Sequence, residues 1–390
     1  MNNHNQPKRG FSKKEYELRV SRAQKIMYQN KLDGIFVTNK ANFHYFSGFD
    51  SQFWESPTRP WFLVIPGEGE PIAVIPEIGL SGITNTWISD VNTWSAPDPQ
   101  DDGISLLLGI IKKLGNRFGR VGAELGREMA LRMPVIDFMK LKHNLDSEIV
   151  DASPAIWEMR MIKTEAEIKH IKYICSIVSE AYDEIPNKIS IGDSERDAAR
   201  KLKKEIYEKG ADTIPFLPAI SGKDGVSQIV CGPSDRILNN GDVLFFDTGS
   251  TYDGYFCDFD RNFGIGTVSD EVRRVHDTLW LATEAGIAAA VPGAKTDDIW
   301  NSMNKIIEES GTVGNSVGRL GHGVGLQLTE PPSHCQGDNT DISENMVLTI
   351  EPGIEYKKGK MIVHEENIVV TRDGPSLLTK RAPREMPIIR

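Results

Sequence analysis

The first part of the chain alternates between helical patterns and short apolar runs of the kind that form buried strands. Between residues 15 and 31, Leu18, Ala23 and Met27 are spaced to share one face of a helix. The apolar runs lie at 34–37, 61–65, 72–75 and 121–125, and further helical patterns lie at 103–114 and 131–141. Buried strands that alternate with helices predict an α/β domain with a mixed or parallel sheet.

A domain boundary is predicted near residues 157–163. Directly after it, Thr164 can cap a helix, and Glu167 completes a capping box. The expected helices of this second region are residues 164–185, 194–209, 270–290 and 297–310. Strand-like stretches lie between and after them and carry the conspicuous acidic residues. We therefore expect two domains, residues 1–160 and residues 161–390.

The first acidic hairpin is predicted at residues 241–263. Two apolar runs, 243–246 and 255–263, flank Asp253-Gly254, which is a strong turn signal. A turn centred on Tyr252-Asp253 places Asp247 opposite Asp258, whereas a turn centred on Asp253-Gly254 places it opposite Asp260, with Asp258 diagonal. Either turn opposes two carboxylates across a ladder. Like charges in that position destabilise a sheet, and burial among Phe side chains increases the cost.

A second acidic hairpin is predicted at residues 346–371. The turn at 357–359 has its midpoint at Lys358, which places Glu351 opposite Glu365 in a run otherwise rich in Val, Ile and Met. Two opposed acid pairs in one domain require a counter-charge, and hard divalent cations prefer carboxylate oxygens. His322 is a candidate imidazole ligand, because glycines at 321, 323 and 325 allow close backbone approach around it.

Composition and charge narrow the class of protein. The 390 residues carry a net charge of −10, which disfavours nucleic acid and anionic membranes as partners. No apolar run approaches the roughly 20 residues needed to cross a bilayer. The four cysteines show no CxxC spacing, and the polar N-terminus lacks the apolar core of a signal peptide, so we expect a cytoplasmic protein.

The order Asp247, Asp258, His322, Glu351, Glu365 resembles the metal site of the M24 superfamily of pita-bread metallohydrolases, which includes creatinase, methionine aminopeptidase and prolidase. The similar segments are FFDTGSTYDGYFCDFDRNF, GHGVGLQLTEPP, LTIEPGIEY, VHEENIVVTRDG and EMRMIKTEAEIKHI. Residues 1–160 are similar to the N-terminal domain of Xaa-Pro peptidases and creatinase. The resemblance implies an α/β creatinase-type domain with a mixed sheet, followed by an α+β pita-bread catalytic domain.

The same resemblance implies roles for individual residues. Two divalent ions, Mn²⁺ by preference, with Co²⁺, Zn²⁺ or Fe²⁺ as alternatives, would be held by the five ligands, and Glu365 would bridge them. A hydroxide between the metals would attack the scissile carbonyl carbon, and Glu351 would accept its proton. The implied activity is that of a Xaa-Pro dipeptidase or aminopeptidase acting on a dipeptide.

The chain departs from the peptidases at positions where they carry further histidines. Thr329 stands seven residues after His322, Val230 or Cys231 stands in IVCGPSDR, and Gly318 stands four residues before His322. We predict His334 as a replacement catalytic histidine, whereas alternation along a strand directs His364 to the opposite face. Asp260 and Thr329 are predicted to contact the substrate. Asp260 faces the same side of its strand as Asp258, so it is also a candidate for an additional metal ligand, and the alternative is a partner for Arg261 or a nearby cation.

The segment FWESPTRPWFLV, residues 53–64, resembles the creatinase segment whose arginine reaches the active site of a neighbouring subunit. The matching residue is Arg59, a candidate clamp for a substrate carboxylate, and Trp54 and Trp61 flank it. Trp54 can cover a cationic group by a cation–π contact or can pack the edge of the sheet. If this likeness holds, the enzyme is at least a homodimer.

Four functions follow from these features. The first is a Xaa-Pro peptidase. The second is a creatinase-like or ectoine-hydrolase-like enzyme that cleaves a C–N bond in a small carboxylate-bearing substrate, which Arg59 and the missing histidines favour. The third is a lyase acting on dimethylsulfoniopropionate. The fourth is a binding protein without activity, and the retention of all five ligands argues against it.

Overall fold

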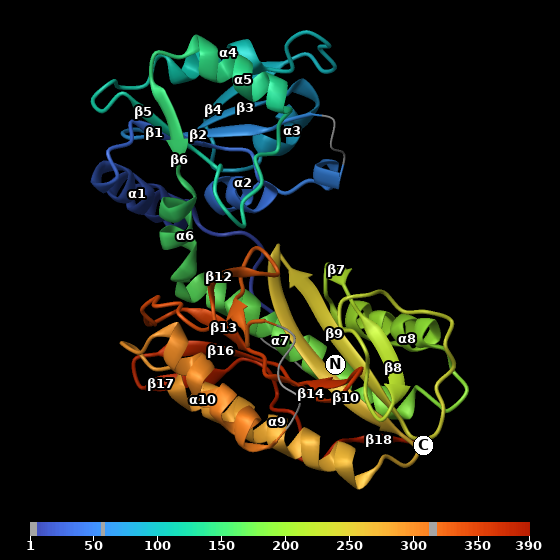
Figure 1. The fold of residues 1–390 in the computed structure, drawn as a ribbon. Coiled ribbons are helices and arrows are strands. Elements are labelled where there is room, and N and C mark those ends of the chain that lie inside the picture. The colour runs from blue at the N-terminus through green and yellow to red at the C-terminus, as the bar shows by residue number, and fades with distance from the viewer. Residues whose placement is uncertain (1–5, 56–58, 312–317) are drawn as a thin grey trace. The chain divides into compact units, whose positions relative to one another are not determined.

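The computed structural model describes residues 6–55, 59–311 and 318–390. It divides into two compact units, residues 8–160 and residues 161–390, and the second unit also includes residues 6 and 7. In Figure 1 the first unit runs from blue to green and the second from green to red. The family-implied fold class, a mixed α/β sheet followed by an α+β domain, is what the two units show.

The first unit contains one sheet and its covering helices. The helices are α1 (Lys13–Gln29), α2 (Lys40–Ser47), η1 (Gln52–Glu55), η2 (Glu77–Gly79), α3 (Leu80–Ile83), α4 (Ile104–Ile111), α5 (Val135–Asn144) and α6 (Ser153–Met161). The strands are β1 (Gly34–Val37), β2 (Phe62–Pro66), β3 (Ile72–Pro76), β4 (Asp90–Trp94), β5 (Arg120–Ala123) and β6 (Glu148–Asp151).

The six strands lie in the order β4-β3-β2-β1-β5-β6. The central pairs β1–β2 and β2–β3 are antiparallel, and the outer pairs are parallel, so the sheet is mixed. Phe36 of β1 packs in a core with residues of α4 and α5, while Ile35 and Val37 point to the other face by alternation and are also buried. Both faces are covered, which explains why these strands read as continuous apolar runs.

Two details of the expected helices are wrong. Leu18 does not face the core of the unit: it is 56% exposed, and the buried face of α1 carries Val20, Ala23 and Met27. The helix expected at 131–141 begins only at Val135, directly after Pro134. The ring of a proline disfavours helical geometry in the residue before it, so the preceding residues stay outside the helix.

Among its described residues, the second unit contains four long helices, one short 3-10 helix and three sheets. The helices are α7 (Glu165–Glu184), η3 (Ile185–Asn187), α8 (Glu195–Lys209), α9 (Asp270–Ala289) and α10 (Thr296–Glu309). The strands are β7 (Thr213–Phe216), β8 (Ala219–Lys223), β9 (Asp242–Tyr252), β10 (Tyr255–Ile265), β11 (His322–Gly323), β12 (Glu330–Ser333), β13 (Val347–Ile350), β14 (Gly353–Lys357), β15 (Lys360–Val363), β16 (Glu366–Thr371), β17 (Gly374–Leu377) and β18 (Ile388–Ile389).

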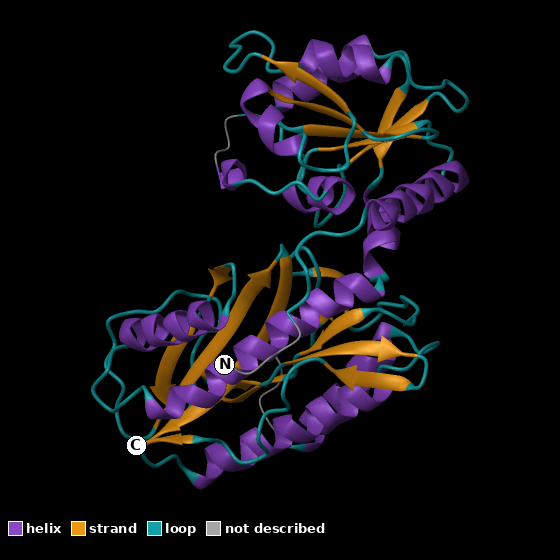
Figure 2. Ribbon diagram, turned by 180° about the vertical axis from the view of Figure 1, so that it is seen from behind, coloured by secondary structure: helices purple, strands orange, loops and turns teal. Residues whose placement is uncertain are grey.

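This unit contains the same arrangement twice, a pair of helices followed by a hairpin. Helices α7 and α8 pack on the sheet β18-β10-β9-β7, in which β8 also pairs with β9. Helix α9, which packs on α10, contacts strands of the sheet β12-β11-β13-β16-β17 and of the hairpin β14-β15 (Figures 1 and 2). The predicted capping box of Thr164 and Glu167 is present at the start of α7.

The turn between β9 and β10 decides the register of the first acidic hairpin. Asp253 and Gly254 both have positive φ angles, 51° and 81°, as a two-residue type I′ turn requires. The second predicted register is therefore the observed one. Asp247 lies opposite Asp260, and Asp258 lies opposite Gly249.

The second acidic hairpin has the predicted register, interrupted at the acids themselves. Ile350 pairs with Glu366 on one side of the interruption, and Gly353 pairs with Val363 on the other. If either ladder is extended residue by residue in the same register, Glu351 falls across from Glu365. Both residues lie between strands, so their backbones are released from the ladder at the point where the carboxylates meet.

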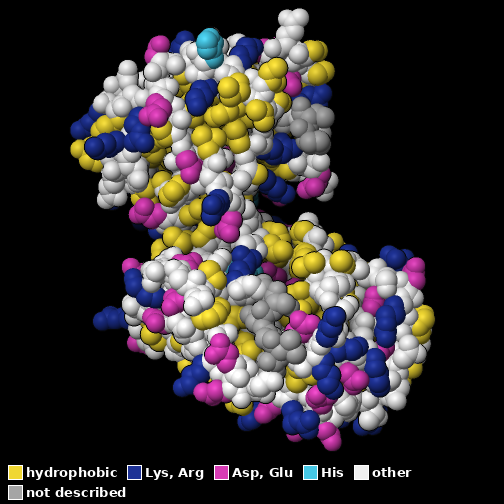
Figure 3. All heavy atoms as spheres, viewed as in Figure 1, with side chains coloured by type: hydrophobic (Ala, Val, Ile, Leu, Met, Phe, Trp, Pro, Cys, Tyr) yellow, Lys and Arg dark blue, Asp and Glu magenta, His cyan; other side chains and the backbone are white. Residues whose placement is uncertain are grey.

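Charges are interspersed over the face of the molecule drawn in Figure 3, where Lys and Arg side chains alternate with Asp and Glu side chains. Hydrophobic side chains gather over the region of α4 and α5 in the same view. On α5, Val135 and Ile136 are 75% and 78% exposed. Among the described residues, no helix is both long enough and apolar enough to cross a bilayer.

The corrected face of α1 can be tested by two substitutions in the same helix. Met27→Ala removes a fully buried side chain and should lower the free energy of unfolding by about 2–4 kcal/mol. Leu18→Ala removes an exposed side chain and should change it by less than about 0.5 kcal/mol. Urea denaturation followed by circular dichroism measures both. Equal losses for the two variants would show that Leu18 is buried after all.

Candidate metal centre

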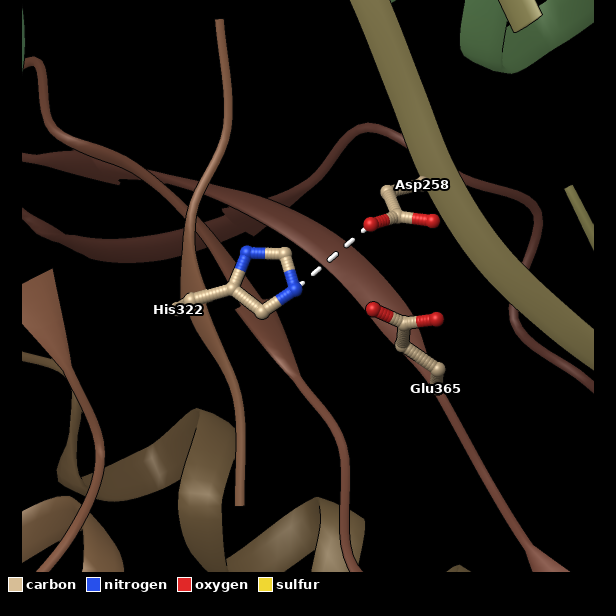
Figure 4. A group of neighbouring side chains, drawn as sticks. All are labelled: Asp258, His322 and Glu365. Carbon is tan, nitrogen blue, oxygen red and sulfur yellow. Dashed lines mark ion pairs between the residues drawn. The ribbon is translucent and has the colours of Figure 1, made fainter. Parts of the chain in front are cut away.

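Three predicted ligands from distant parts of the chain meet in the second unit. Asp258 comes from β10, His322 from β11, and Glu365 from the residue before β16. One ligand atom of each lies within 4.8 Å of the ligand atoms of the other two. Figure 4 shows the three side chains pointing toward one another, and the Nε2 atom of His322 lies 3.5 Å from Oδ2 of Asp258. All three side chains are buried.

The orientation of His322 leaves one imidazole nitrogen for a ligand. Its Nδ1 atom lies 2.9 Å from the carbonyl oxygen of Gly323, which can only accept, so Nδ1 carries the proton and Nε2 presents its lone pair to the cluster. Burial lowers the pKa of His322 to about 3, which keeps the ring neutral. The neighbouring glycines are required, since a Cβ atom on Gly321 or Gly323 would lie 2.4 Å or 2.3 Å from a backbone oxygen.

The remaining two predicted ligands join the cluster electrostatically. Burial and then the charge of Glu351 raise the pKa of Asp247 well above its usual value. Burial likewise raises the pKa of Glu351, which keeps some exposed area, to about 7. Burial and the charges of Asp258, Glu351 and Asp247 raise the pKa of Glu365. The pKa values of Asp247 and Glu365 are thus both raised by the charge of Glu351, which connects the two remaining ligands to the cluster.

Unused oxygen atoms show what the cluster lacks. Among the described residues, Oδ1 of Asp247, Oδ1 of Asp258 and Oε1 of Glu365 are buried without a hydrogen-bond partner. A buried carboxylate oxygen without a partner is costly, and divalent cations are the counter-charge that oxygen-rich sites with one imidazole bind. The residues present thus fit a metal site, and the divalent metal chemistry expected from the sequence is matched by the donor set.

Asp260 also belongs to this cluster. It faces Asp247 across the hairpin, and both of its carboxylate oxygens are buried without a hydrogen-bond partner among the described residues. Burial and the charge of Asp247 raise its pKa. The alternative reading, a side-chain partner for Arg261, does not apply, because Arg261 donates to the backbone carbonyl of Asp260 instead, at 2.6 Å. A role for Asp260 as an additional ligand stays a prediction.

Asn367 holds the two acidic hairpins together. Its side-chain oxygen accepts a hydrogen bond from the backbone N–H of Asp258 at 3.0 Å, and its side-chain nitrogen donates to the carbonyl of the same residue. The side chain therefore acts as a short strand partner for β10 and fixes Asp258 relative to β16, where Glu365 is located. Sequence reasoning missed Asn367. The one feature of the sequence that could have indicated its role is a polar amide within the otherwise apolar run ENIVVT.

An ion pair supports the cluster from behind. Arg261 lies 3.0 Å from the carboxylate of Glu366, and it also donates to the backbone carbonyl of Glu365 at 3.0 Å. Arg381 pairs with the other oxygen of Glu366 at 3.1 Å. The backbone of Glu365 is thereby fixed by side chains that do not face the metal ligands themselves.

The two candidate histidines lie in different surroundings. His334 is fully buried beside Gly321. Its backbone N–H donates to the carbonyl of Gly321, its own carbonyl accepts from the N–H of Leu320, and burial lowers its pKa to about 4. It is thus no surface-loop residue, and its catalytic role stays a prediction. His364 turns to α9 as expected, where its Nδ1 atom lies 3.1 Å from the hydroxyl of Thr283.

Thr329 contacts an arginine that sequence reasoning missed. Arg319 donates from Nη2 to the hydroxyl of Thr329 at 3.2 Å and from Nη1 to that of Ser333 at 3.3 Å. The neighbouring Glu330 instead forms a buried ion pair with Lys163 at 3.1 Å. The signal for Arg319 was its place three residues before His322.

The other positions where peptidases carry histidines are exposed. Val230 and Cys231 lie on a surface segment between β8 and β9, and Gly318 is exposed in front of β11. None of these residues belongs to the group of Asp258, His322 and Glu365. The structure therefore offers no histidine at these positions to handle a substrate.

Arg59, Trp54 and Trp61 lie in the first unit. Trp54 is buried and packs edge-on against Phe43, with ring centroids 5.4 Å apart, and 5.7 Å from Trp61. The cation over its ring is Arg132, at 5.1 Å, rather than Arg59. The packing interpretation accounts for both tryptophans within this unit, while the carboxylate clamp at Arg59 stays a prediction.

The repulsion within the cluster predicts how the metal-free protein responds to pH. Acids with raised pKa values keep their protons in the folded state after the unfolded chain has released them, so stability falls as pH rises. Burial lowers the pKa of His322 and of His334, so these two histidines make the folded state more stable as pH rises. This contribution changes only below about pH 6.5, the ordinary pKa of histidine in the unfolded chain. With chelator, the melting temperature should therefore fall from about pH 6.5 to 8.5.

Differential scanning fluorimetry with chelator and with saturating Mn²⁺ measures this effect. The stabilisation by Mn²⁺ should grow with pH, because the ion replaces the protons. Glu351→Gln removes one charge and should flatten the curve of the metal-free protein. A metal-free melting temperature that is constant or rises over this range would contradict mutual repulsion among these acids.

Asn367 predicts a second outcome. Asn367→Ala removes both bonds to the backbone of Asp258 and should weaken divalent metal binding by about 10–100-fold, the effect typical of groups that orient a ligand. Isothermal titration calorimetry with Mn²⁺ measures the affinity. Asn301→Ala, at an exposed asparagine of α10, is the matched control and should bind normally. Unchanged affinity in Asn367→Ala would show that Asp258 is fixed without it.

Comparison with known families agrees with this centre. The model of metallopeptidase family M24 matches residues 169–372, which is more than half of the chain. The model of the creatinase/prolidase N-terminal domain matches residues 19–162. The two matches follow each other along the chain in the same order as the two compact units.

Individual relatives align along nearly their whole lengths. A Xaa-Pro dipeptidase of Pyrococcus furiosus is 28% identical over 93% of this chain and 97% of its own. A prolidase structure from Thermococcus sibiricus has a TM-score of 0.85 at 28% identity and covers 97% of this chain and 100% of its own. The dipeptidase PepE of Mycobacterium ulcerans has a TM-score of 0.84 at 25% identity, covering 97% and 99%. The family expected from the five ligand positions is therefore confirmed, and the chain belongs to metallopeptidase family M24.

Proposed function

We propose that this protein is a dipeptidase that hydrolyses Xaa-Pro dipeptides with two divalent metal ions held by Asp247, Asp258, His322, Glu351 and Glu365. The observation that carries the proposal is the convergence of Asp258, His322 and Glu365, together with buried oxygen atoms of Asp247, Asp258 and Glu365 that lack a hydrogen-bond partner among the described residues. Relatives over the whole chain carry the names Xaa-Pro dipeptidase, dipeptidase PepE and prolidase, which supports the choice of substrate.

The residues of the chain divide the catalytic work among them. When bound, the metal pair supplies Lewis-acid polarisation of the scissile carbonyl and lowers the pKa of the attacking water. Glu351 accepts the proton of that water and delivers it to the departing amine, since it keeps some exposed area while the other four acids of the cluster are buried. Asn367 and Arg261 keep Asp258 and Glu365 in place during the reaction.

Three finer points belong to the proposal. Mn²⁺ is the proposed metal, because it suits oxygen-rich sites with one imidazole. A cytoplasmic location is supported by the four cysteines, all of which are free thiols. A homodimer is supported by the likeness of Arg59 to a clamp that reaches a neighbouring subunit and by the exposed apolar side chains of α5.

A second candidate is a hydrolase of a small carboxylate-bearing substrate, of the creatinase or ectoine-hydrolase kind. The observation that favours it is the absence of histidines at Thr329, Cys231 and Gly318, where the peptidases use them on a peptide. The metal cluster serves both candidates equally. Substrate tests therefore separate them, whereas metal tests do not.

The proposal predicts hydrolysis of Xaa-Pro dipeptides by the metal-loaded protein. Wild-type protein loaded with Mn²⁺ should cleave members of a Xaa-Pro panel, and chelation should abolish cleavage. His322→Ala should lower kcat/KM by at least about 100-fold, because a metal ligand is lost. His143→Ala, an exposed histidine of α5, is the matched control.

Release of amine from the panel measures the substrate preference. Elemental analysis of the same preparation identifies the bound metal, and sedimentation measures the oligomeric state. No turnover across the panel with two metals bound would remove the dipeptidase. Turnover of creatine-like or ectoine-like substrates in that case would establish the second candidate.

A further inference from the structure

A pocket lies within the second unit, behind the strands that carry the metal ligands. Its volume is about 220 Å³, and its walls come from α7, β10, α9 and the segment 380–387 that follows β17. Arg261 lines the pocket and follows Asp260 along β10, and His364 lines it and precedes Glu365. Because successive side chains of an extended chain point to opposite faces, the pocket lies on the reverse side of these strands from the metal cluster.

Two hydrogen-bond acceptors of this pocket are buried without a partner. The side chains of Asn262 and His276 are only 4% and 2% exposed. Asn262 donates from its amide nitrogen to the carbonyl of Val363 at 2.6 Å, so its unpaired atom is the oxygen Oδ1. The Nε2 atom of His276 lies 3.4 Å from the carbonyl of Pro383, which can only accept, so the unpaired Nδ1 atom presents a lone pair. Burial lowers the pKa of His276 to about 4, which keeps this ring neutral.

These acceptors indicate that a donor group is missing from the pocket. A buried polar atom without a partner costs free energy, and most such atoms in proteins are paired. In the part of the chain that the structure describes, the other unpaired carboxylate and amide oxygens lie on the acids of the metal cluster, where a cation fits. By the same argument, a group that donates hydrogen bonds fits the acceptors of this pocket.

The charges around the pocket favour an uncharged ligand. Arg261, Lys380 and Arg381 line it and would repel a cation. Both arginines are paired with Glu366, at 3.0 Å and 3.1 Å, and Lys380 is paired with Asp183 at 2.7 Å. An anion would therefore compete with carboxylates that are already bound, so neither sign of charge has a free partner here.

The walls and the size favour a single ring. Apolar surface is supplied by two aromatic side chains and three prolines, namely Tyr182, Phe263, Pro186, Pro383 and Pro387. Rigid apolar walls with a few polar groups are typical of small-molecule sites. A volume of about 220 Å³ lies below the roughly 300–1,000 Å³ of pockets that hold drug-sized ligands, so one ring with its substituents fits.

Arg261 connects this pocket to the metal cluster. Its Nη1 atom donates to the backbone carbonyls of Glu365 at 3.0 Å and Asp260 at 2.6 Å, and its Nη2 atom donates to the carbonyl of Lys380 at 2.6 Å. The pocket also takes walls from both helix pairs, α7 from the first and α9 from the second. A ligand that orders Arg261 therefore also orders the backbone of two acids of the cluster, which lowers the cost of ordering them when a metal binds.

We propose that this pocket binds a small uncharged ring molecule that donates hydrogen bonds to Asn262 and His276, and that its occupancy tightens divalent metal binding through Arg261. Phenols and heterocycles with two O–H or N–H donors belong to this class. The site is separate from the one that hydrolyses a dipeptide, so the proposal does not depend on the identity of the substrate.

Calorimetry on the Mn²⁺-loaded protein tests the site. The probe is resorcinol, whose two hydroxyl donors are too far apart to chelate one metal ion, and resorcinol dimethyl ether is the matched ring without donors. Wild type should bind resorcinol with a Kd below about 1 mM, and about 10-fold or more tightly than the ether. His276→Phe keeps a ring but removes Nδ1 and should lose most of that preference. His143→Phe, at an exposed histidine of α5, is the matched control and should bind as wild type does.

The coupling is tested by titrating Mn²⁺ into metal-free wild type with and without saturating resorcinol. Resorcinol should raise the affinity for Mn²⁺ by at least about 5-fold, and by linkage Mn²⁺ should raise the affinity for resorcinol by the same factor. An affinity for Mn²⁺ that resorcinol leaves unchanged would overturn the coupling through Arg261.

Other results would overturn the site itself. Equal affinities for resorcinol and its ether, or unchanged preference in His276→Phe, would show that these acceptors bind no ligand. If His276→Phe does not fold, a wild-type crystal soaked with bromoresorcinol decides, because anomalous scattering locates the bromine. Bromine within this pocket supports the proposal, whereas bromine only at the metal cluster, or a pocket that holds only water, overturns it. Absence of dipeptide hydrolysis would change none of these measurements, so the two proposals fail separately.

Discussion

Mutual repulsion among buried carboxylates is the constraint on which the catalytic unit depends. Asp247, Asp258, Asp260 and Glu365 are buried, and each has a pKa raised by removal from water. A sheet that brings such groups together is costly unless something else fixes it. The fixing contacts are made by backbone and neighbouring side chains, chiefly Asn367, so the acids themselves remain available to a cation.

Each of the two helix-pair-and-hairpin halves of the catalytic unit contributes some of the metal ligands. Each half supplies a helix pair and a hairpin, and each hairpin brings acids face to face across its register. Neither hairpin directs an imidazole to the cluster, because His364 of the second hairpin faces α9. The imidazole of His322 comes from the two-residue strand β11, whose backbone fits only with glycines at 321 and 323. Metal binding thus depends on three segments that are distant in sequence and is a property of the folded unit.

Much of this architecture was predictable because it depends on local pattern. The long helices α7 to α10 follow from periodicity and caps, and the register of the second acidic hairpin follows from counting residues to its turn, whereas counting left two registers open for the first hairpin. Leu18 was misplaced because periodicity alone does not say which side of a helix meets the core. Asn367 and Arg319 were missed because their partners, Asp258 and Thr329, are remote or follow a loop, so no spacing rule connects them.

The turn at Asp253-Gly254 sets the register of the acidic residues in the first hairpin. Its two left-handed residues determine which carboxylate stands across from Asp247, although the turn contributes no ligand itself. Inserting one residue at this tip would shift the hairpin by one pairing step and turn every side chain of one strand to the other face. A homologue with a longer or shorter turn at this position would then lose the cation site although it retains each acidic residue. Counting ligand residues in sequences alone would therefore overestimate how many homologues bind metal.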